Sequence, residues 1–122
     1  MKTSNEQFAK YSPEERDIKG KRCRYFRAYD LWVGDNGWLI AKAIGSTGKY
    51  KFHAILKDSK GRKYVITERD GKEEKLYLDF AVVVCFCKRH PNDGCKYDII
   101  HKDGEIGNDY YGNLIWEKRG DY

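Results

Sequence analysis

The stretch DIIHKDGEIGNDYYGNLIWE at 98–117 decides how we interpret the rest of this chain. Its apolar start predicts a strand that ends at His101, and a turn follows. The Gly-Asn-Asp sequence at 107–109 is typical of a helix start, because Asn and Asp side chains accept backbone N–H bonds at an N-cap. We therefore expect a short helix at 113–116 that carries Asn113. A strand, a histidine, a loop and a helix-borne asparagine together are typical of a hydrolytic site with one general base and one bound metal.

Length and composition indicate a single small domain. The chain has 122 residues, enough to bury a modest core, and its 15% of aromatic residues is typical of a globular protein. The 24 Lys and Arg residues against 19 Asp and Glu residues give a net charge of +5, which is compatible with a polyanionic partner without requiring one. Ser-Pro-Glu-Glu at 12–15 resembles a helix start. We expect a basic arm or short helix at 1–22 and one domain at 23–122.

The apolar runs of the chain are too short to cross a membrane. The longest, at 80–87, falls far below the roughly 20 residues that a spanning helix needs. The first residues lack the apolar segment of a secretory signal. We therefore expect a cytoplasmic protein whose four cysteines are reduced.

Cys85, Cys87, His90 and Cys95 lie close enough in sequence to be considered as zinc ligands. A structural zinc site usually has two pairs of ligands, with about two to four residues between the members of a pair. Here a single residue separates Cys85 from Cys87, and a second pair is missing, so we interpret these cysteines as free thiols. His53 and His90 belong to no recognisable group, and we assign them no role.

Period-two patterns predict an antiparallel meander of about five strands, at 31–33, 38–40, 50–56, 63–67 and 75–78. Short turns that contain glycine separate these strands, and an Asn-Gly pair between two apolar runs is the strongest local hairpin signal. The apolar run at 80–86 fits a buried strand, which its three valines favour, or a buried helix, which Asp79 as a cap favours. Periodicity alone leaves both open.

Three blocks of the sequence resemble the small HNH endonucleases of phages and mobile introns, whose core is the ββα-metal motif. The segment WVGDNGWL at 32–39 resembles the hairpin Y-x-V-S-x-x-G-x-V that opens those proteins. The segment LDFAVVVCF at 78–86 resembles their V-H-R-L-V-A-x-x-F helix, and this likeness favours helix for the run. The third block is the most specific, since IHKDG at 100–104, Asn108 and NLIW at 113–116 resemble D-H-x-D-G-N followed by N-N and N-L-x-W.

The resemblance implies an α+β fold in which the antiparallel meander is followed by a ββα-metal, strand-loop-helix unit. It implies that His101 is the general base that activates water for attack on a phosphodiester, a task that suits imidazole because its pKa lies near neutral pH. Asn113 would orient that histidine or face the metal. A divalent ion, most simply Mg²⁺, would polarise the phosphate and stabilise the leaving 3′ oxygen.

The metal-binding positions depart from the family pattern. The aspartate that precedes the histidine in the family is Ile100 here, and an aliphatic side chain cannot coordinate Mg²⁺, which takes oxygen ligands. Asp79 replaces the family's earlier histidine, and Glu105 replaces the asparagine of D-G-N. Either a rearranged set drawn from Asp79, Asp98, Asp103 and Glu105 holds the metal, or the site has lost its metal. Of these, Asp79, Asp103 and Glu105 are our candidate ligands.

Basic residues on the predicted hairpins are the candidates for DNA contact, because phosphate contacts by Lys and Arg supply most of the affinity for DNA. A solvated sheet face with alternating charges would give the same pattern. The candidates are Lys42, Lys49, Lys51, Lys57, Lys60, Arg62 and Lys63. We expect an HNH endonuclease-like protein that binds double-stranded DNA as a monomer. Two alternatives remain for catalysis: metal-dependent DNA cleavage, or an inactive DNA-binding or protein-interaction module of phage or mobile-element origin.

Overall fold

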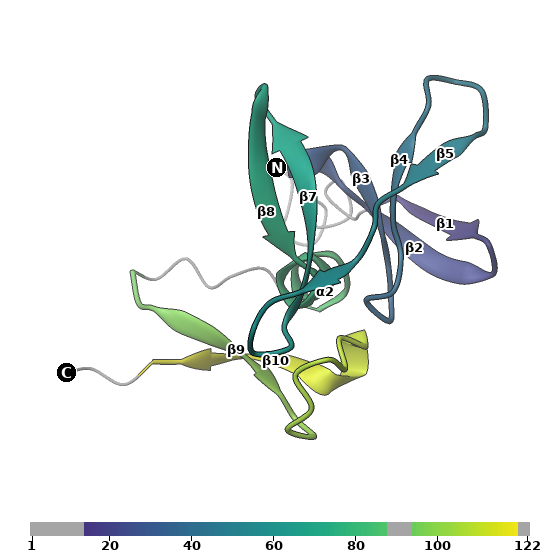
Figure 1. The fold of residues 1–122 in the computed structure, drawn as a ribbon. Helices are drawn as coiled ribbons and strands as arrows, with labels where there is room; N and C mark the ends of the chain where they lie inside the picture. Colours follow the sequence, from purple (N-terminus) through teal and green to yellow (C-terminus); the bar gives the residue numbers. More distant parts are fainter. Residues whose placement is uncertain (1–13, 88–93, 120–122) are drawn as a thin grey trace, which may run out of the picture.

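The structure is a computed structural model that describes residues 14–87 and 94–119. Within these ranges, antiparallel strands surround a central α-helix, α2 (Leu78–Phe86), which Figure 1 shows end-on with strands on three sides. The α+β class with antiparallel hairpins is therefore confirmed. No helix in these ranges is long and apolar enough to cross a membrane.

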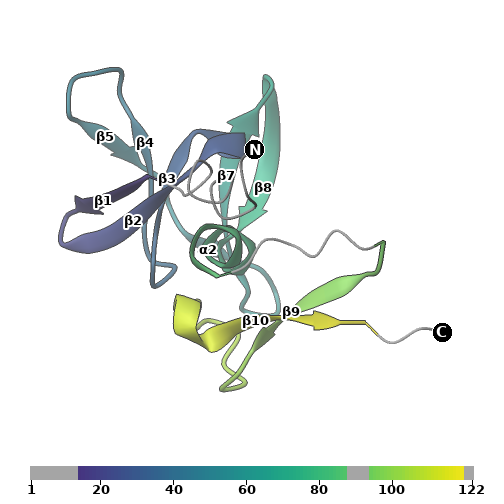
Figure 2. The ribbon, with the colours of Figure 1, turned by 180° about the vertical axis from the view of Figure 1, so that it is seen from behind.

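The strands form three groups, which Figure 2 shows from behind, separated by α2. The largest is a five-stranded sheet in the order β1 (Glu15–Ile18), β2 (Lys21–Phe26), β3 (Leu31–Gly34), β4 (Ile40–Ala43) and β5 (Tyr50–Phe52), with the short turn η1 (Arg27–Tyr29) between β2 and β3. The second contains β6 (Leu56–Lys57), β7 (Lys63–Arg69) and β8 (Lys72–Tyr77). The third is the pair β9 (Tyr97–His101) and β10 (Leu114–Lys118), joined by a loop that ends in η2 (Tyr111–Asn113).

The described part of the predicted basic arm is a hairpin. Residues 15–22, expected in a loose arm or short helix, lie in β1 and the start of β2, and the start of the expected helix lies outside the described residues. Lys19 and Gly20 form the turn with φ of 52° and 75°. Two successive positive φ angles characterise the type I′ hairpin turn, which twists the strands in the direction that a sheet prefers.

Helix α2 settles the choice that periodicity left open. Strands from all three groups contact it, and most of its side chains are buried, including Val82 and Val83 with 0% exposure. An element that is apolar on every side carries no amphipathic pattern, which is why the sequence alone fitted both a strand and a helix. Tertiary packing therefore overrides the strand preference of valine here.

The second half of the opening stretch differs from its prediction. In place of a helix at 113–116, the chain makes the single 3₁₀ turn η2 and then the strand β10. β10 pairs antiparallel with β9, and this register sets Leu114 opposite His101. The expected strand-loop-helix is thus a strand-loop-strand hairpin. In β10, the branched Ile115 and the aromatic Trp116 are residues that favour a strand.

Candidate functional site

Asp79, His101 and Asp109 meet where α2, the end of β9 and the loop before η2 come together. His101 Nε2 lies 2.7 Å from Oδ1 of Asp109 and 3.9 Å from Oδ2 of Asp79. Their side chains are only 9%, 1% and 3% exposed for His101, Asp109 and Asp79. The structure thus brings together two residues that the sequence singled out, and it adds Asp109. We call these three residues the Asp-His-Asp cluster.

Asp79 is held firmly in the first turn of α2, where the helix dipole favours a carboxylate. Its Oδ1 accepts the backbone N–H of Phe80 at 2.6 Å. Arg62 donates to both of its oxygens at 2.8 Å, and the guanidinium also lies 3.8 Å from the centre of the Tyr77 ring. Such bidentate pairing fixes the carboxylate in position as well as neutralising it.

Asp109 faces a buried lysine. Lys63 Nζ lies 3.6 Å from Oδ2 of Asp109, and the two side chains are 0% and 1% exposed. The ammonium donates to the carbonyl oxygen of Gly37 at 3.0 Å and lies 3.6 Å from the centre of the Trp38 ring. Gly37 has a φ of +71°, and a Cβ added there would come within 2.4 Å of the Cβ of Asp109. The glycine therefore allows the turn between β3 and β4 to close over this pair.

Burial shifts the acidity of both partners towards their neutral forms. Desolvation raises the pKa of Asp109 above its ordinary value, against the hydrogen bond from His101 and the charge of Lys63. Desolvation also lowers the pKa of Lys63, against the charge of Asp109. The pKa of Arg62 is raised in spite of desolvation, because its hydrogen bonds with Asp79 favour the charged form. Desolvation therefore outweighs charge pairing at the Asp109 end of the cluster, whereas Asp79 is held by the bidentate contact with Arg62.

Lys63 was predicted to contact DNA, and its burial contradicts that prediction. The sequence did contain a signal for this, since residues alternate between the two faces of a strand. Lys63, Val65 and Thr67 share one face of β7, and all three are buried. Asp109 was missed because Asn-Asp resembles a helix cap, whereas its side chain points at His101 in the structure.

Asn113 holds the loop that follows His101. Its Nδ2 donates to Oδ1 of Asp103 and to the carbonyl oxygen of Asn108, both at 2.9 Å, and its Oδ1 accepts the N–H of Asp103 at 3.0 Å. Asn108 Nδ2 completes the set by donating to Oδ2 of Asp103 at 2.7 Å. We call Asp103, Asn108 and Asn113 the loop clamp. Among the described residues, these amide contacts lie within the loop and not on His101.

The structure separates the other predicted ligands from the Asp-His-Asp cluster. The carboxylate of Asp103 accepts hydrogen bonds from Asn108 and Asn113 within the loop clamp. Its Oδ1 also accepts the N–H of Glu105 at 2.8 Å. Hydrogen bonds from Asn108, Glu105 and Asn113, in that order, hold the pKa of Asp103 below its ordinary value. The Glu105 side chain is exposed, and Asp98 pairs with Arg119. Only Asp79 among the predicted ligands belongs to the cluster that the described residues form.

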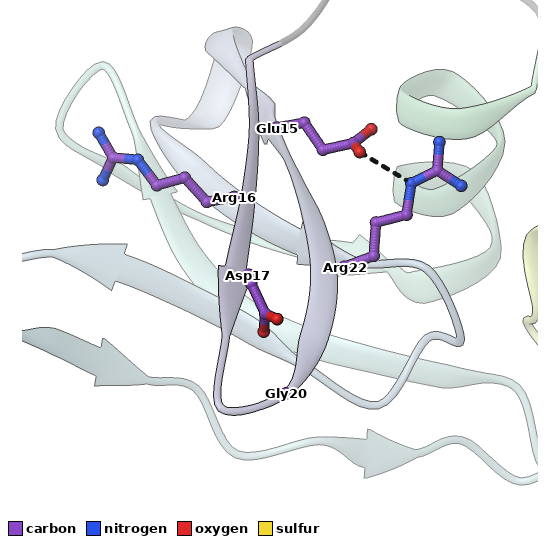
Figure 3. Close-up of a pocket in the computed structure, with 5 residues that line it drawn as sticks. All are labelled: Glu15, Arg16, Asp17, Gly20 and Arg22. Atoms are coloured by element: carbon purple, nitrogen blue, oxygen red, sulfur yellow. Dashed lines mark ion pairs between the residues drawn. The ribbon is translucent and has the colours of Figure 1, made fainter.

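A surface hollow of about 580 Å³ lies beside the cluster. Arg62, Asp79 and His101 line it, together with apolar side chains from α2, β9 and β10. A second hollow, of about 390 Å³, lies on the β1–β2 hairpin and is shown in Figure 3. There Arg22 pairs with Glu15 at 3.1 Å, and Arg16 points away from that pair. The first hollow is the one that gives access to His101.

The donor set suits a divalent cation. The ligand atoms of the Asp-His-Asp cluster all lie within 4.8 Å of one another. Oδ2 of Asp109 is buried without a hydrogen-bond partner among the described residues, so one carboxylate oxygen is available. Against this, Arg62 and Lys63 already balance the two carboxylates, and Ile100 offers no donor atom. The cluster therefore contains the ligand types that a divalent cation takes, but the positive charges of Arg62 and Lys63 lie beside it.

The remaining basic candidates lie on two hairpins that belong to different sheets. Lys42, Lys49 and Lys51 belong to the β4–β5 hairpin, and Lys57 and Lys60 lie around the β6–β7 turn. All five are exposed, and Lys42 pairs with Asp30 at 3.0 Å, a contact that solvent screens. Arg62, by contrast, is committed to Asp79.

No protein-family model matches the sequence, and no curated protein matches it. One solved structure, described as "DNA binding and cleavage by the HNH homing endonuclease I-HmuI", resembles the chain with a TM-score of 0.59 and 23% sequence identity. The fold is HNH-like. The match covers 85% of this chain and 52% of the other, so the chain spans about half the length of that HNH endonuclease. The likeness establishes the fold, and the activity has to be argued from the site.

Proposed function

We propose that this chain is an HNH endonuclease-like DNA-binding protein with a hydrolytic centre at His101. The observation that carries the proposal is the buried pair of His101 and Asp109, 2.7 Å apart and next to a surface hollow. A histidine oriented by a carboxylate is an arrangement that suits general-base catalysis. The structural likeness to an HNH homing endonuclease, whose description names DNA binding and cleavage, supports DNA as the substrate.

In the proposed reaction, His101 takes a proton from water while the water oxygen attacks the phosphorus of a DNA phosphodiester. The bond from phosphorus to the 3′ oxygen breaks, that oxygen leaves with the electron pair and takes a proton from solvent to become a 3′ hydroxyl, and a 5′ phosphate remains. In the tautomer that this reaction needs, Nε2 carries a hydrogen that it donates to Asp109, 2.7 Å away, and Nδ1 is left to take the proton. The carboxylate also stabilises the imidazolium that forms. Asn113 acts as a positioning residue, because it holds the loop that follows His101.

Asp79 and Asp109 are the residues that would hold a divalent cation beside His101. One or two carboxylates together with phosphate oxygens of the substrate are the usual ligands of Mg²⁺, and Mn²⁺ accepts the same set. When bound, the cation supplies positive charge at the scissile phosphate. Asp103 and Glu105 take no part in this proposal. The carboxylate of Asp103 is hydrogen-bonded within the loop clamp, and the Glu105 side chain is exposed.

The exposed lysines of the β4–β5 hairpin and the β6–β7 turn are the proposed contacts with duplex DNA. Their attraction to phosphate releases counterions, so affinity should fall steeply as salt increases. Replacing one contacting lysine should lower the slope of log affinity against log salt by about 1. Retention of duplex DNA at increasing salt, for the wild type and for Lys51→Ala, measures this slope.

Plasmid nicking tests the hydrolytic centre. We expect the wild type to convert supercoiled plasmid to the nicked or linear form with Mg²⁺ or Mn²⁺. His101→Ala should nick about 10²- to 10⁴-fold more slowly, because this is the usual contribution of a general base to the rate. His53→Ala is the matched control, since His53 lies outside the cluster, and it should nick at the wild-type rate. Equal nicking by wild type and His101→Ala would disprove the role of His101.

A second candidate function is a DNA-binding module that does not cut. Two observations favour it: Ile100 stands where the family has a metal-binding aspartate, and Arg62 and Lys63 already neutralise the cluster. This function predicts salt-sensitive retention of duplex DNA with no nicking by the wild type in either cation. The same two assays therefore separate the two functions.

A further inference from the structure

Lys63 is a charged residue that the fold buries completely. It is the largest fully buried side chain among the described residues, and its charged end enters the core next to Asp109. A buried ammonium is unfavourable unless it is paired and hydrogen-bonded, and Lys63 meets both conditions through Asp109 and the carbonyl of Gly37. A residue held this way at a candidate metal site requires an explanation beyond surface charge.

The ammonium faces the one oxygen of Asp109 that has no hydrogen bond. Oδ1 of Asp109 is engaged by His101 at 2.7 Å, while Oδ2 lacks a hydrogen-bond partner among the described residues. Lys63 Nζ lies 3.6 Å from Oδ2, which is within ion-pair distance but beyond a hydrogen bond. The oxygen most available to a divalent cation is therefore also the oxygen that the lysine charge covers.

We propose that the Lys63 ammonium is a built-in counter-cation that weakens binding of divalent cations to the Asp-His-Asp cluster. This inference rests on the proposed metal site. Lys63 compensates the buried Asp109 carboxylate when no metal is bound, and it opposes a second positive charge at Oδ2. The residue thus sets the metal affinity of the site and keeps the cluster assembled without metal.

Lys63 cannot easily move aside when a cation arrives. Its Nζ is fixed from other directions by the carbonyl of Gly37 at 3.0 Å and by the ring of Trp38, whose centre is 3.6 Å away. Repulsion between like charges a few ångströms apart is strong at a buried site, because few water molecules screen it. Arg62 differs in this respect, since its side chain is 34% exposed and can turn towards solvent.

Binding of Mn²⁺ tests the proposal without reference to catalysis. The free-ion signal in electron paramagnetic resonance gives the Mn²⁺ dissociation constant of the wild type, of Lys63→Met and of Lys72→Met. Methionine keeps much of the length of lysine without its charge, and Lys72 is an exposed lysine at the start of β8. We expect Lys63→Met to bind Mn²⁺ at least tenfold more tightly than the wild type, and Lys72→Met to match the wild type. Adding Asp109→Asn to Lys63→Met should abolish the gain.

Thermal unfolding with and without Mn²⁺ provides a second measurement. Because a bound cation replaces the lost ammonium, Mn²⁺ should raise the melting temperature of Lys63→Met, and of the polar variant Lys63→Gln, more than that of the wild type. Variants that fold only with Mn²⁺ would also support the proposal. Variants that stay unfolded in both conditions, or that bind Mn²⁺ no better than the wild type, would overturn it.

The outcomes distinguish this inference from the proposed function. Wild-type nicking at His101, together with equal Mn²⁺ affinity in the wild type and Lys63→Met, overturns the inference and leaves the proposed function in place. Failure of both proteins to bind Mn²⁺ overturns the inference and the metal site together. Retention of duplex DNA is measured separately, so it tests the DNA-binding part of the proposed function in either case.

Discussion

Two groups of polar side chains lie at the loop end of the β9–β10 hairpin, and they differ in burial and in hydrogen bonding. In the loop clamp, neutral amides surround one carboxylate near the surface, and Asp103 receives hydrogen bonds on both oxygens. In the Asp-His-Asp cluster, the side chains are buried, two carboxylates are balanced by two cations, and one oxygen of Asp109 has no hydrogen bond. Every carboxylate oxygen of the clamp is hydrogen-bonded, whereas the cluster leaves one buried oxygen of Asp109 without a hydrogen bond.

The two groups also differ in their relation to the family motif. The clamp uses Asp103, Asn108 and Asn113, the residues that match the motif most closely. The cluster depends on Asp79, which replaces a histidine of the motif, and on Asp109 and Lys63, which lie outside the matched blocks. In this chain three residues that match the motif shape the loop, and Asp79, Asp109 and Lys63 supply the charge beside His101. Buried charges with unusual acidity are typical of functional sites.

The largest expected effect comes from removing the charge of Asp109. Asp109→Ala leaves the buried Lys63 ammonium without its carboxylate and His101 without its hydrogen-bond partner. Loss of one member of a buried ion pair typically costs about 3–5 kcal/mol, because the other charge stays buried. Urea unfolding of Asp109→Ala beside the wild type measures this loss in the free energy of unfolding.

A double variant shows whether the cost comes from the unpaired charge. In Asp109→Leu with Lys63→Met, both charges are replaced by apolar groups, and such replacements are often nearly neutral. The double variant should therefore be more stable than Asp109→Ala alone. A cost below about 1 kcal/mol for Asp109→Ala would show that the cluster is held no more tightly than a surface pair.

A smaller effect is expected from the loop clamp. Asn113→Ala removes three side-chain hydrogen bonds, which lie partly in solvent, and we expect a loss of about 1–3 kcal/mol in the free energy of unfolding. Hydrogen exchange at the N–H of Asp103, which donates to Asn113, should become faster. Asn108→Ala is the control, since it removes two side-chain hydrogen bonds, one to Asp103 and a longer one from the N–H of Tyr110 at 3.3 Å, and it should cost less. A greater loss for Asn113→Ala than for Asp109→Ala would reverse the contrast drawn above.

Local signals predicted most of the hairpins. The Asn-Gly pair placed the turn between β3 and β4 correctly, because Gly37 has the positive φ that such a turn requires. Helix α2 was predicted only through the family resemblance, because an element that is buried on every side shows no hydrophobic periodicity in its sequence. β10 was mistaken for a helix because the Asn108 and Asp109 side chains, which resemble caps, contact Asp103 and His101 earlier in the same hairpin.

The site was less accessible to sequence reasoning than the fold. His101 and Asp79 were found through the motif, but Asp109 and Lys63 come together only through tertiary packing. The turn between β3 and β4 rests on the loop before η2, where the N–H of Tyr111 donates to the carbonyl of Asp35 at 2.9 Å. This contact brings Gly37, and with it the hydrogen bond to Lys63, to Asp109. No local pattern encodes an encounter between segments so far apart in the chain.

The smallest effect, a difference in acidity between two aspartates, tests the comparison most directly. The pKa of Asp103 lies below the ordinary 3.8, because hydrogen bonds from Asn108, Glu105 and Asn113 favour its charged form. The pKa of Asp109 lies above 3.8, because burial disfavours its charge. As the pH falls from neutrality, Asp109 should therefore take up its proton before Asp103, which carboxyl ¹³C NMR of metal-free protein can follow.

The two aspartates should also couple to stability with opposite signs. Asp103 stabilises the fold above its unfolded pKa, and this contribution is lost as the pH falls through its lower folded pKa. Asp109 contributes in the opposite sense: its raised pKa favours the fold only at low pH, and that contribution is lost as the pH rises through the folded value. In Asn108→Ala, the largest cause of the Asp103 shift is gone, so its pKa should return towards 3.8 while that of Asp109 stays raised. Parallel movement of both values would mean that the clamp and the cluster form one electrostatic unit.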